Sequence, residues 1–483
     1  MRFQTLALVV SYAFAAGMAN ADVPTSAGAA RLVTVLQTYL GTEPGVVDVV
    51  LAGDAYAVTL DLAPLLAKVS DRGAAYNISP VEFSLIDNGD ATWKMDQDQA
   101  FAFAVKVPGK AEIRLNIARI SGSGLFDEAL QAFSASTTQL EKVSLDELIT
   151  NMGAGETNVS YSFDSARYES TAKPSMLAGV DTVASYSMAG VRENFTVPDF
   201  NSGGPPSQIS LTAENYIASG TSKGLRMDAI YKLIAFLMAN PSEAAITAHR
   251  GGLKALLQDG LPFFENIETS GTITAVAIAT PLGEFGLDEA IISVAANGAV
   301  PNGMVREGFS LKGLTTPAGI VPLWAKDLVP STLSMEFTLS RFDLAAPIAI
   351  LLETFDFVSD PKQDAAVLAA FLPDGVLDVT IAPGSITAPI YAVTYESAIS
   401  IVLGDEADAP TGTAKVTATG LNAVKEALKS APAEIGMQFA PMLGVAEGMA
   451  AKGDGDLLVW DMEFTPKGAV LMNGVDLMGL GQQ

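Results

Sequence analysis

A period-two alternation of apolar and polar residues is the feature that most constrains the fold of this 483-residue chain. Every second residue from Phe101 to Val107 is apolar, a Pro108-Gly109 turn follows, and Glu112 to Ala118 alternates again. The pattern recurs at Val159–Phe163 and Leu333–Leu339. Such alternation is typical of antiparallel strands with one dry and one wet face. The sequence therefore predicts a sheet with many one-sided strands.

Helical patterns follow several of these strands. Three predicted strands lead through a short turn into predicted helices, which span Leu125–Phe133, Leu344–Phe355 and Ala423–Lys429. Ser144 with Glu147 resembles a capping box before a helix over Leu145–Met152, and Met227–Ala239 reads as another helix. We therefore predict an α+β fold: a large antiparallel, curved β-sheet with short helices packed on one face and repeated strand-turn-helix units.

The domain organisation follows from one loop and from the N-terminus. The Gly- and Pro-rich segment Asn201–Ser207 predicts a boundary near residue 204, between an N-terminal α+β region (22–204) and a C-terminal α+β region (205–483). Residues 1–21 have the three zones of a signal peptide: a charge at Arg2, an apolar stretch and a small-x-small site that predicts cleavage after Ala21. A stable span would need about 20 uninterrupted apolar residues, so we expect no membrane span after cleavage.

Composition excludes several chemistries. The chain has no cysteine and one histidine, which rules out thiolate chemistry and any metal site built on several imidazoles. Its formal net charge is −26, and loss of the signal segment with Arg2 would make it −27. Such a chain is repelled by phosphates, so nucleic acid is not an expected partner. With 49% hydrophobic residues it can nevertheless bury a substantial core.

The search for reactive motifs gives no catalytic, cofactor-binding or metal-binding residue. His249 stands just before a Gly-Gly pair and reads as a polar residue at a helix end. Ser170 and Lys173 match the Ser-x-x-Lys spacing by chance, because strand-like residues precede them and Pro174 follows. The acidic clusters 405–408 and 454–456 lack the full spacing of a calcium loop and read as solvated turns. We therefore predict no cofactor and no enzymatic activity.

The end of the chain carries a resemblance to a known family. Leu457–Asp461 followed by Pro466–Gly474, together with the export signal and the strand-to-helix junctions, resembles the exported alphaproteobacterial proteins grouped as domain of unknown function 2125. A fainter likeness is to AsmA-type envelope proteins, which implies a curved antiparallel sheet with an apolar inner face and a link to lipid movement. Neither resemblance transfers a functional residue to this chain.

Two functions remain open at this point, with a third more distant. The first is a non-enzymatic periplasmic protein that holds lipid or another apolar ligand on the dry face of a curved sheet. The alternative is an envelope scaffold or protein-interaction module, and a hydrolase assembled from remote residues is the distant one. The first hypothesis depends on an open apolar face, since short helices could equally cover that face and leave an ordinary dry core.

Overall fold

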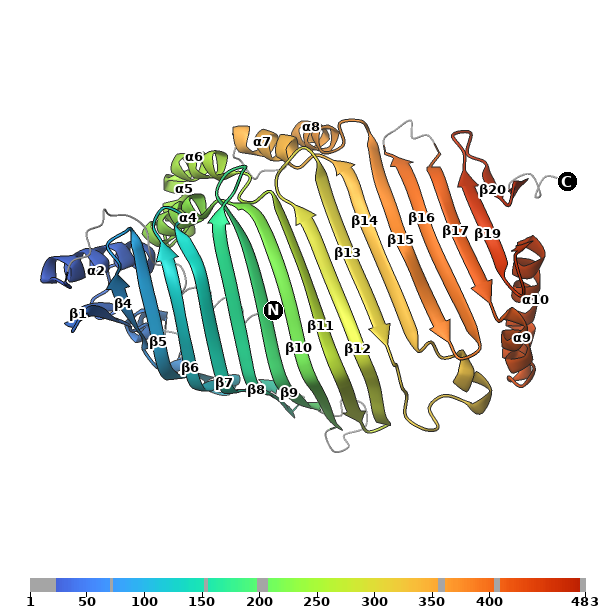
Figure 1. Cartoon of the computed structure of the whole chain (residues 1–483), viewed down its shortest axis with the longest axis horizontal. Helices are drawn as coiled ribbons and strands as arrows, with labels where there is room; N and C mark the ends of the chain where they lie inside the picture. Colours follow the sequence, from blue (N-terminus) through green and yellow to red (C-terminus); the bar gives the residue numbers. More distant parts are fainter. Residues whose placement is uncertain are drawn as a thin grey trace. The chain divides into compact units, whose positions relative to one another are not determined.

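The computed structural model describes residues 23–69, 73–151, 155–197, 207–354, 361–403 and 409–477. The chain divides into two compact units between Ile267 and Glu268. The predicted boundary near residue 204 and the predicted signal peptide lie outside the described residues, so both stay predictions. Each unit is built on antiparallel strands that pair mainly with their neighbours in sequence (Figure 1).

Unit 1 contains ten strands and five helices within its described residues. The strands are β1 (Val47–Ala52), β2 (Ala55–Leu60), β3 (Ala75–Ile78), β4 (Val81–Asp87), β5 (Thr92–Val107), β6 (Ala111–Asp127), β7 (Ala132–Asn151), β8 (Gly155–Pro174), β9 (Val180–Val197) and β10 (Ser207–Leu225). The helices are α2 (Ser26–Leu40), α3 (Ala63–Val69), α4 (Met227–Ala239), α5 (Glu243–Ala248) and α6 (Arg250–Gly260). Strands β5 to β10 form a meander, while β4 and β3 pair with the first and second halves of β5.

Unit 2 repeats the strand-next-to-strand order. Its strands are β11 (Asn266–Thr280, from Glu268 on), β12 (Gly283–Asn297), β13 (Gly303–Lys312), β14 (Thr332–Phe342), β15 (Val376–Ala388), β16 (Tyr391–Val402), β17 (Thr411–Thr419), β18 (Ala451–Lys452), β19 (Leu458–Phe464), β20 (Val470–Met472) and β21 (Val475–Asp476). Its helices are the 3-10 helix η2 (Leu323–Leu328) and α7 (Ala345–Thr354), α8 (Pro361–Phe371), α9 (Leu421–Lys429) and α10 (Ala433–Met449). Consecutive strands pair from β12 to β17, and β17 then pairs with β19.

The α+β class predicted from the sequence is wrong. Strands account for 55% of the structure and helices for 24%, so the fold is mostly antiparallel sheet. The first predicted strand-turn-helix unit is absent, because β6 continues through Phe126 and turns directly into β7, where Phe126 lies opposite Phe133. The other two junctions do lead into helices, from β14 into α7 and from β17 into α9.

The helix predicted over Leu145–Met152 is also wrong in its described part. Ser144 and Glu147 do not cap a helix but lie within β7, where Ser144 faces Asn116 on one side and Ser162 on the other. Pairing partners on both sides satisfy the backbone of β7, and this tertiary ladder outweighs a local capping pattern. The hairpin predicted from the Pro108-Gly109 turn is confirmed as β5–β6.

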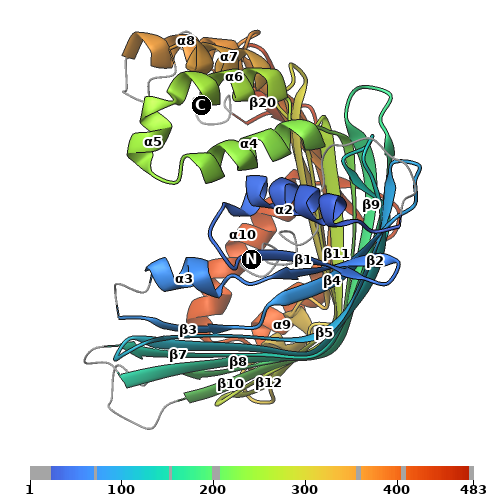
Figure 2. The same cartoon turned by 90° about the vertical axis from the view of Figure 1, so that its left-hand side faces the viewer.

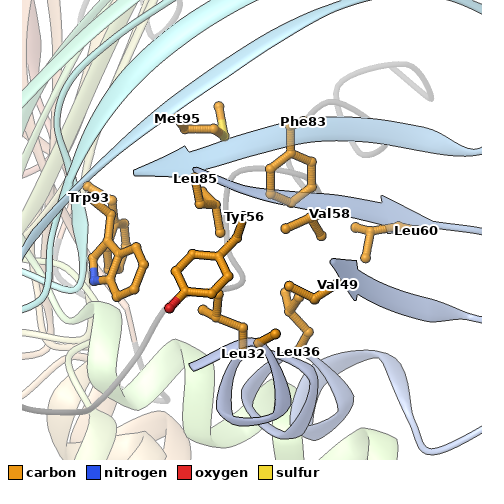
Figure 3. Packing of buried hydrophobic residues seen from close by; sticks show 12 residues of the cluster. Leu32, Leu36, Val49, Tyr56, Val58, Leu60, Phe83, Leu85, Trp93 and Met95 are labelled. Atoms are coloured by element: carbon orange, nitrogen blue, oxygen red, sulfur yellow. The ribbon is translucent and has the colours of Figure 1, made fainter. Parts of the chain in front are cut away.

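A packed core lies at one end of unit 1, between α2 and the strands β1, β2, β4 and β5 (Figure 3). Helix α2 begins where the Thr25 hydroxyl accepts a hydrogen bond from the Gly28 amide at 3.0 Å. It places Leu32 and Leu36 against Leu85 and Val58, and all four side chains are at most 3% exposed. In Figure 2, α2 and α4 lie on the concave side of the unit 1 strands.

Candidate functional site

The most extensive candidate surface in unit 2 is one face of its sheet, which we call the unit 2 apolar face. Strand pairing brings apolar side chains from seven strands onto this face. Its members are Ala290, Ile292, Val294, Ala296, Val305, Phe309, Leu311, Leu333, Met335, Phe337, Leu339, Val379, Ile381, Ile386, Val393, Tyr395, Ile399, Ala414, Val416, Ala418, Leu458, Trp460, Met462 and Phe464. The sequence alternation therefore produces a continuous apolar surface rather than isolated stripes.

The part of the unit 2 apolar face formed by β12, β13 and β14 is open to solvent. Ile292, Phe309 and Met335 form one cross-strand row over β12, β13 and β14, and their side chains are 54%, 37% and 43% exposed. Val294 in the next row is also exposed. Monomeric soluble proteins rarely expose contiguous apolar patches of large size, and such patches mark binding surfaces.

Tyr395 shows how the sheet accommodates a large ring on this face. Gly384 lies opposite Tyr395, and a Cβ at Gly384 would come within 2.6 Å of the tyrosine ring. The ring therefore lies over the glycine, and its hydroxyl donates to the Ser334 carbonyl of the strand beyond at 2.8 Å. The hydroxyl is thus satisfied by the sheet itself and leaves an apolar ring surface.

Helix α10 adjoins the β19 end of the unit 2 apolar face. The Trp460 indole donates to the Ala446 carbonyl of α10 at 2.8 Å, and Asn473 donates to the Met449 carbonyl at 2.8 Å. The helix carries no charged residue between Glu434 and Glu447. Several of its apolar side chains are exposed, namely Met437, Phe439, Met442 and Val445. The apolar surface of unit 2 therefore continues from the sheet onto a helix.

Unit 1 has a corresponding surface beyond its helix-covered end, which we call the unit 1 apolar face. Register aligns apolar residues from β5 to β10 in rows, and two carboxylates, Glu147 and Glu193, interrupt them. The apolar members are Phe101, Phe103, Val105, Ile113, Leu115, Ile117, Leu140, Val143, Leu145, Val159, Tyr161, Phe163, Ala166, Tyr186, Met188, Phe195, Ile209, Leu211 and Tyr216. Because side chains alternate along a strand, the charged residues of these strands lie mainly on the other face of the sheet.

A line of irregular pairing bends these strands. Lys142 on β7 and Gly190 on β9 both have positive φ, at 50° and 68°. A Cβ at Gly190 would lie 2.1 Å from Asp164, so only glycine fits there. Asp164 accepts two hydrogen bonds from the Arg192 guanidinium, at 2.9 and 3.1 Å, which lowers the pKa of that carboxyl. Irregular pairs of this kind bend a strand and increase its twist.

Polar atoms are present within the unit 1 apolar face. The hydroxyls of Tyr161 and Tyr186 both donate to the sulfur of Met188, at 3.2 and 3.5 Å. Burial raises the pKa of Tyr161 to about 12, and electrostatic repulsion from Glu193 and from ionised Tyr186 adds to the shift. Burial also raises the pKa of Glu193, which lies opposite Tyr161. These groups are partly removed from water, and Leu115, Val143 and Phe163 of the same face are at most 7% exposed.

Charged side chains in the hollows of the two sheets are engaged with one another. In unit 1 a hollow of about 470 Å³ contains Asp98, whose pKa is lowered by hydrogen bonds from Arg119 at 2.7 and 2.8 Å. In unit 2 a hollow of about 860 Å³ contains Lys415 and Asp461, whose charged atoms lie 3.9 Å apart. Paired exposed charges of this kind are typical of a solvated sheet surface.

The residues that the sequence singled out do not come together. His249 is exposed between α5 and α6, and its Nδ1 lies 3.0 Å from the Ala245 carbonyl. Ser170 lies on β8 with its hydroxyl 2.7 Å from that of Ser136, and Asp456 accepts the Gly420 amide at 2.9 Å. The acidic cluster 405–408 lies outside the described residues. The sequence did not predict the group of Tyr161, Tyr186 and Met188, because only strand pairing brings residues of β8 and β9 together. The Tyr-x-Met spacing of 186–188 was its sole local signal.

Over the described part of the chain, no group of three or more His, Cys, Asp or Glu side chains is arranged to hold a metal ion. Among the helices described, none combines the length and the apolar character needed to cross a bilayer.

Comparisons with known proteins leave the chain without an assigned family. No protein-family model matches it, and no curated protein matches it. A solved structure, the siderophore receptor PirA from Acinetobacter baumannii, aligns with 8% sequence identity over 75% of this chain and 56% of the receptor chain, at a TM-score of 0.18. That score is too low to relate the two folds. The resemblance to domain of unknown function 2125 therefore stays a prediction.

Proposed function

We propose that this protein is a non-enzymatic, exported binding protein that holds acyl chains of a lipid on the apolar faces of its sheets. The observation that carries the proposal is the exposed row Ile292–Phe309–Met335 within the unit 2 apolar face. An extended aliphatic chain matches a surface that is apolar over seven neighbouring strands. Covering such a surface removes apolar area from water, at roughly 25 cal/mol per Å².

The proposal is supported by the distribution of charge as well as by the apolar row. Glu307 is the charged member of the unit 2 apolar face between Val294 and Phe337, whereas the opposite face carries Glu336, Glu396 and Lys415. A sheet with one polar face and one open apolar face presents an amphipathic surface to a lipid. Periplasmic location and a role in the cell envelope belong to the same proposal.

Native mass spectrometry tests the proposal on the full chain purified from a bacterial periplasm. We expect co-purifying lipid in wild type and about a tenfold loss of lipid affinity in the double variant Phe309→Gln/Met335→Gln, since two cross-strand apolar side chains are removed from the face. The matched control is Ala398→Gln/Thr413→Gln, an exposed cross-strand pair on the polar face. It should bind as wild type does.

Two results would count against the proposal. Absence of lipid from repeated preparations, together with no uptake of added lipid, would exclude lipid binding. A consistent protein neighbour trapped by crosslinking at Ile292 or Phe309 would instead assign the open row to a protein interface, the scaffold alternative.

A further inference from the structure

Two strong hydrogen-bond donors converge on one weak acceptor in the unit 1 apolar face. The Tyr161 hydroxyl of β8 and the Tyr186 hydroxyl of β9 both donate to the sulfur of Met188. A thioether sulfur is a weak acceptor, whereas a phenol is a good donor. Buried tyrosine hydroxyls normally find a strong partner. The hydrogen bonds of both hydroxyls to the Met188 sulfur are therefore weak, and each hydroxyl could donate a stronger bond to a better acceptor.

The surroundings of the two hydroxyls are aromatic and partly dry. The Tyr161 ring packs edge-to-face on Phe163 with centroids 6.0 Å apart, and the Tyr186 ring packs on Tyr216 at 6.0 Å. Burial raises the pKa of both phenols, so both remain protonated donors at neutral pH. In a partly desolvated setting, a donor without a good acceptor is unfavourable. A ligand oxygen placed between them would relieve this.

The charge at the site selects among ligand oxygens. Glu193 lies directly opposite Tyr161 in the register and places an acidic group beside the two hydroxyls. An anionic phosphate or carboxylate would be repelled by it, as by the acidic chain as a whole. A neutral carbonyl oxygen is not repelled and has two lone pairs, one for each hydroxyl.

We propose that Tyr161 and Tyr186 bind the ester carbonyl oxygen of a neutral acylglycerol whose acyl chain lies along the unit 1 apolar face. The inference rests on the proposed function and names the ligand class at this site. Both hydroxyls lie within hydrogen-bonding reach of the same sulfur, so both can reach one acceptor atom placed beside it. Phe103 and Leu145, half-buried residues in the same row as Tyr161, would contact the chain.

A matched pair of ligands tests the inference. Monooleoylglycerol has the ester carbonyl, and its ether analogue 1-O-oleylglycerol has the same chain and glycerol without it. Calorimetric titration of the full chain should show about a tenfold preference for the ester, as expected for two hydrogen bonds of ordinary strength. The infrared band of the ester carbonyl should move to lower frequency on binding.

Variants assign the preference to the two hydroxyls. Tyr161→Phe/Tyr186→Phe keeps both rings, so ether affinity should be unchanged while the ester preference and the infrared shift disappear. Tyr168→Phe is the matched control, since Tyr168 lies on the same strand, is 41% exposed and is not bonded to Met188 in the structure. If the double variant fails to fold, the two single variants should each lose part of the preference.

The outcomes separate this inference from the proposed function. Equal binding of ester and ether by wild type overturns the inference and leaves lipid binding in place. A preference that survives in the double variant also overturns it. Failure of wild type to bind either ligand overturns the proposed function itself.

Discussion

Two regions of this molecule, one in each unit, use the same strand pattern with opposite results. Under α2 in unit 1, Leu36 and Leu85 are fully buried. On the unit 2 apolar face, Ile292 and Met335 are 54% and 43% exposed although they stand in strands with equally regular alternation. The difference lies in what covers the sheet and not in the strands. Alternation specifies a two-faced strand, whereas a core requires a second layer.

The difference between the covered and the uncovered region predicts that the largest loss of stability follows a substitution in the core under α2. Leu36→Ala should lower the free energy of unfolding of unit 1 by about 2–5 kcal/mol, because it leaves a cavity between α2 and the sheet. Urea unfolding followed by the fluorescence of Trp93, which belongs to the same core, measures it. A loss below about 1 kcal/mol would mean that α2 is not held as described.

A smaller effect is expected at the beginning of the covering helix. Thr25→Ala removes the hydroxyl that accepts the Gly28 amide and should cost about 1 kcal/mol in the same urea experiment. Thr25→Ser retains the hydroxyl and serves as the control. If both variants lose stability equally, the contribution of Thr25 comes from its methyl group rather than from capping.

In the uncovered region, truncation should matter little for stability. Met335→Ala is expected to change the free energy of unfolding by no more than about 0.5 kcal/mol, because an exposed side chain makes few contacts to lose. The same variant should reduce lipid uptake. A loss comparable to that of Leu36→Ala would show that a second layer covers this row in solution.

Glu193 provides the smallest and most local test. Burial raises the pKa of Glu193 above the ordinary value of a glutamate, so the folded state binds this proton more tightly than the unfolded state. Its contribution therefore favours folding below the unfolded pKa and is lost as pH rises through the folded pKa. Glu193→Gln should flatten the decline of the urea midpoint above pH ~4.5. Glu214→Gln, an exposed carboxyl on the neighbouring strand, should leave it unchanged.

Strands with local turn chemistry could be predicted from the sequence, while the layers above them could not. The β5–β6 hairpin follows from alternation and a Pro-Gly turn, both local signals. The helix prediction at Ser144 and Glu147 was wrong because these residue types also suit a helix cap. The residues that pair with Ser144 in the sheet, Asn116 and Ser162, are distant in sequence.

The candidate sites, too, could be predicted from the sequence only where the signal is local. The open row Ile292–Phe309–Met335 follows from alternation plus register, but its exposure depends on which helices come to rest on the sheet. Tyr161 belongs to a predicted strand, whereas its convergence with Tyr186 on Met188 requires the pairing of two strands joined by a turn. Side-chain contacts across strands are tertiary information.

The meander of β5 to β10 also has a consequence for how the chain reaches its native state. Each of these strands pairs with the one just made, so every new strand can add to an existing edge after closing only a short turn. Assembly can then proceed from the N-terminal side while later strands are still being synthesised. Until the next strand arrives, the growing edge is unpaired and open to wrong partners, which places the risk of aggregation in the interval between successive strands.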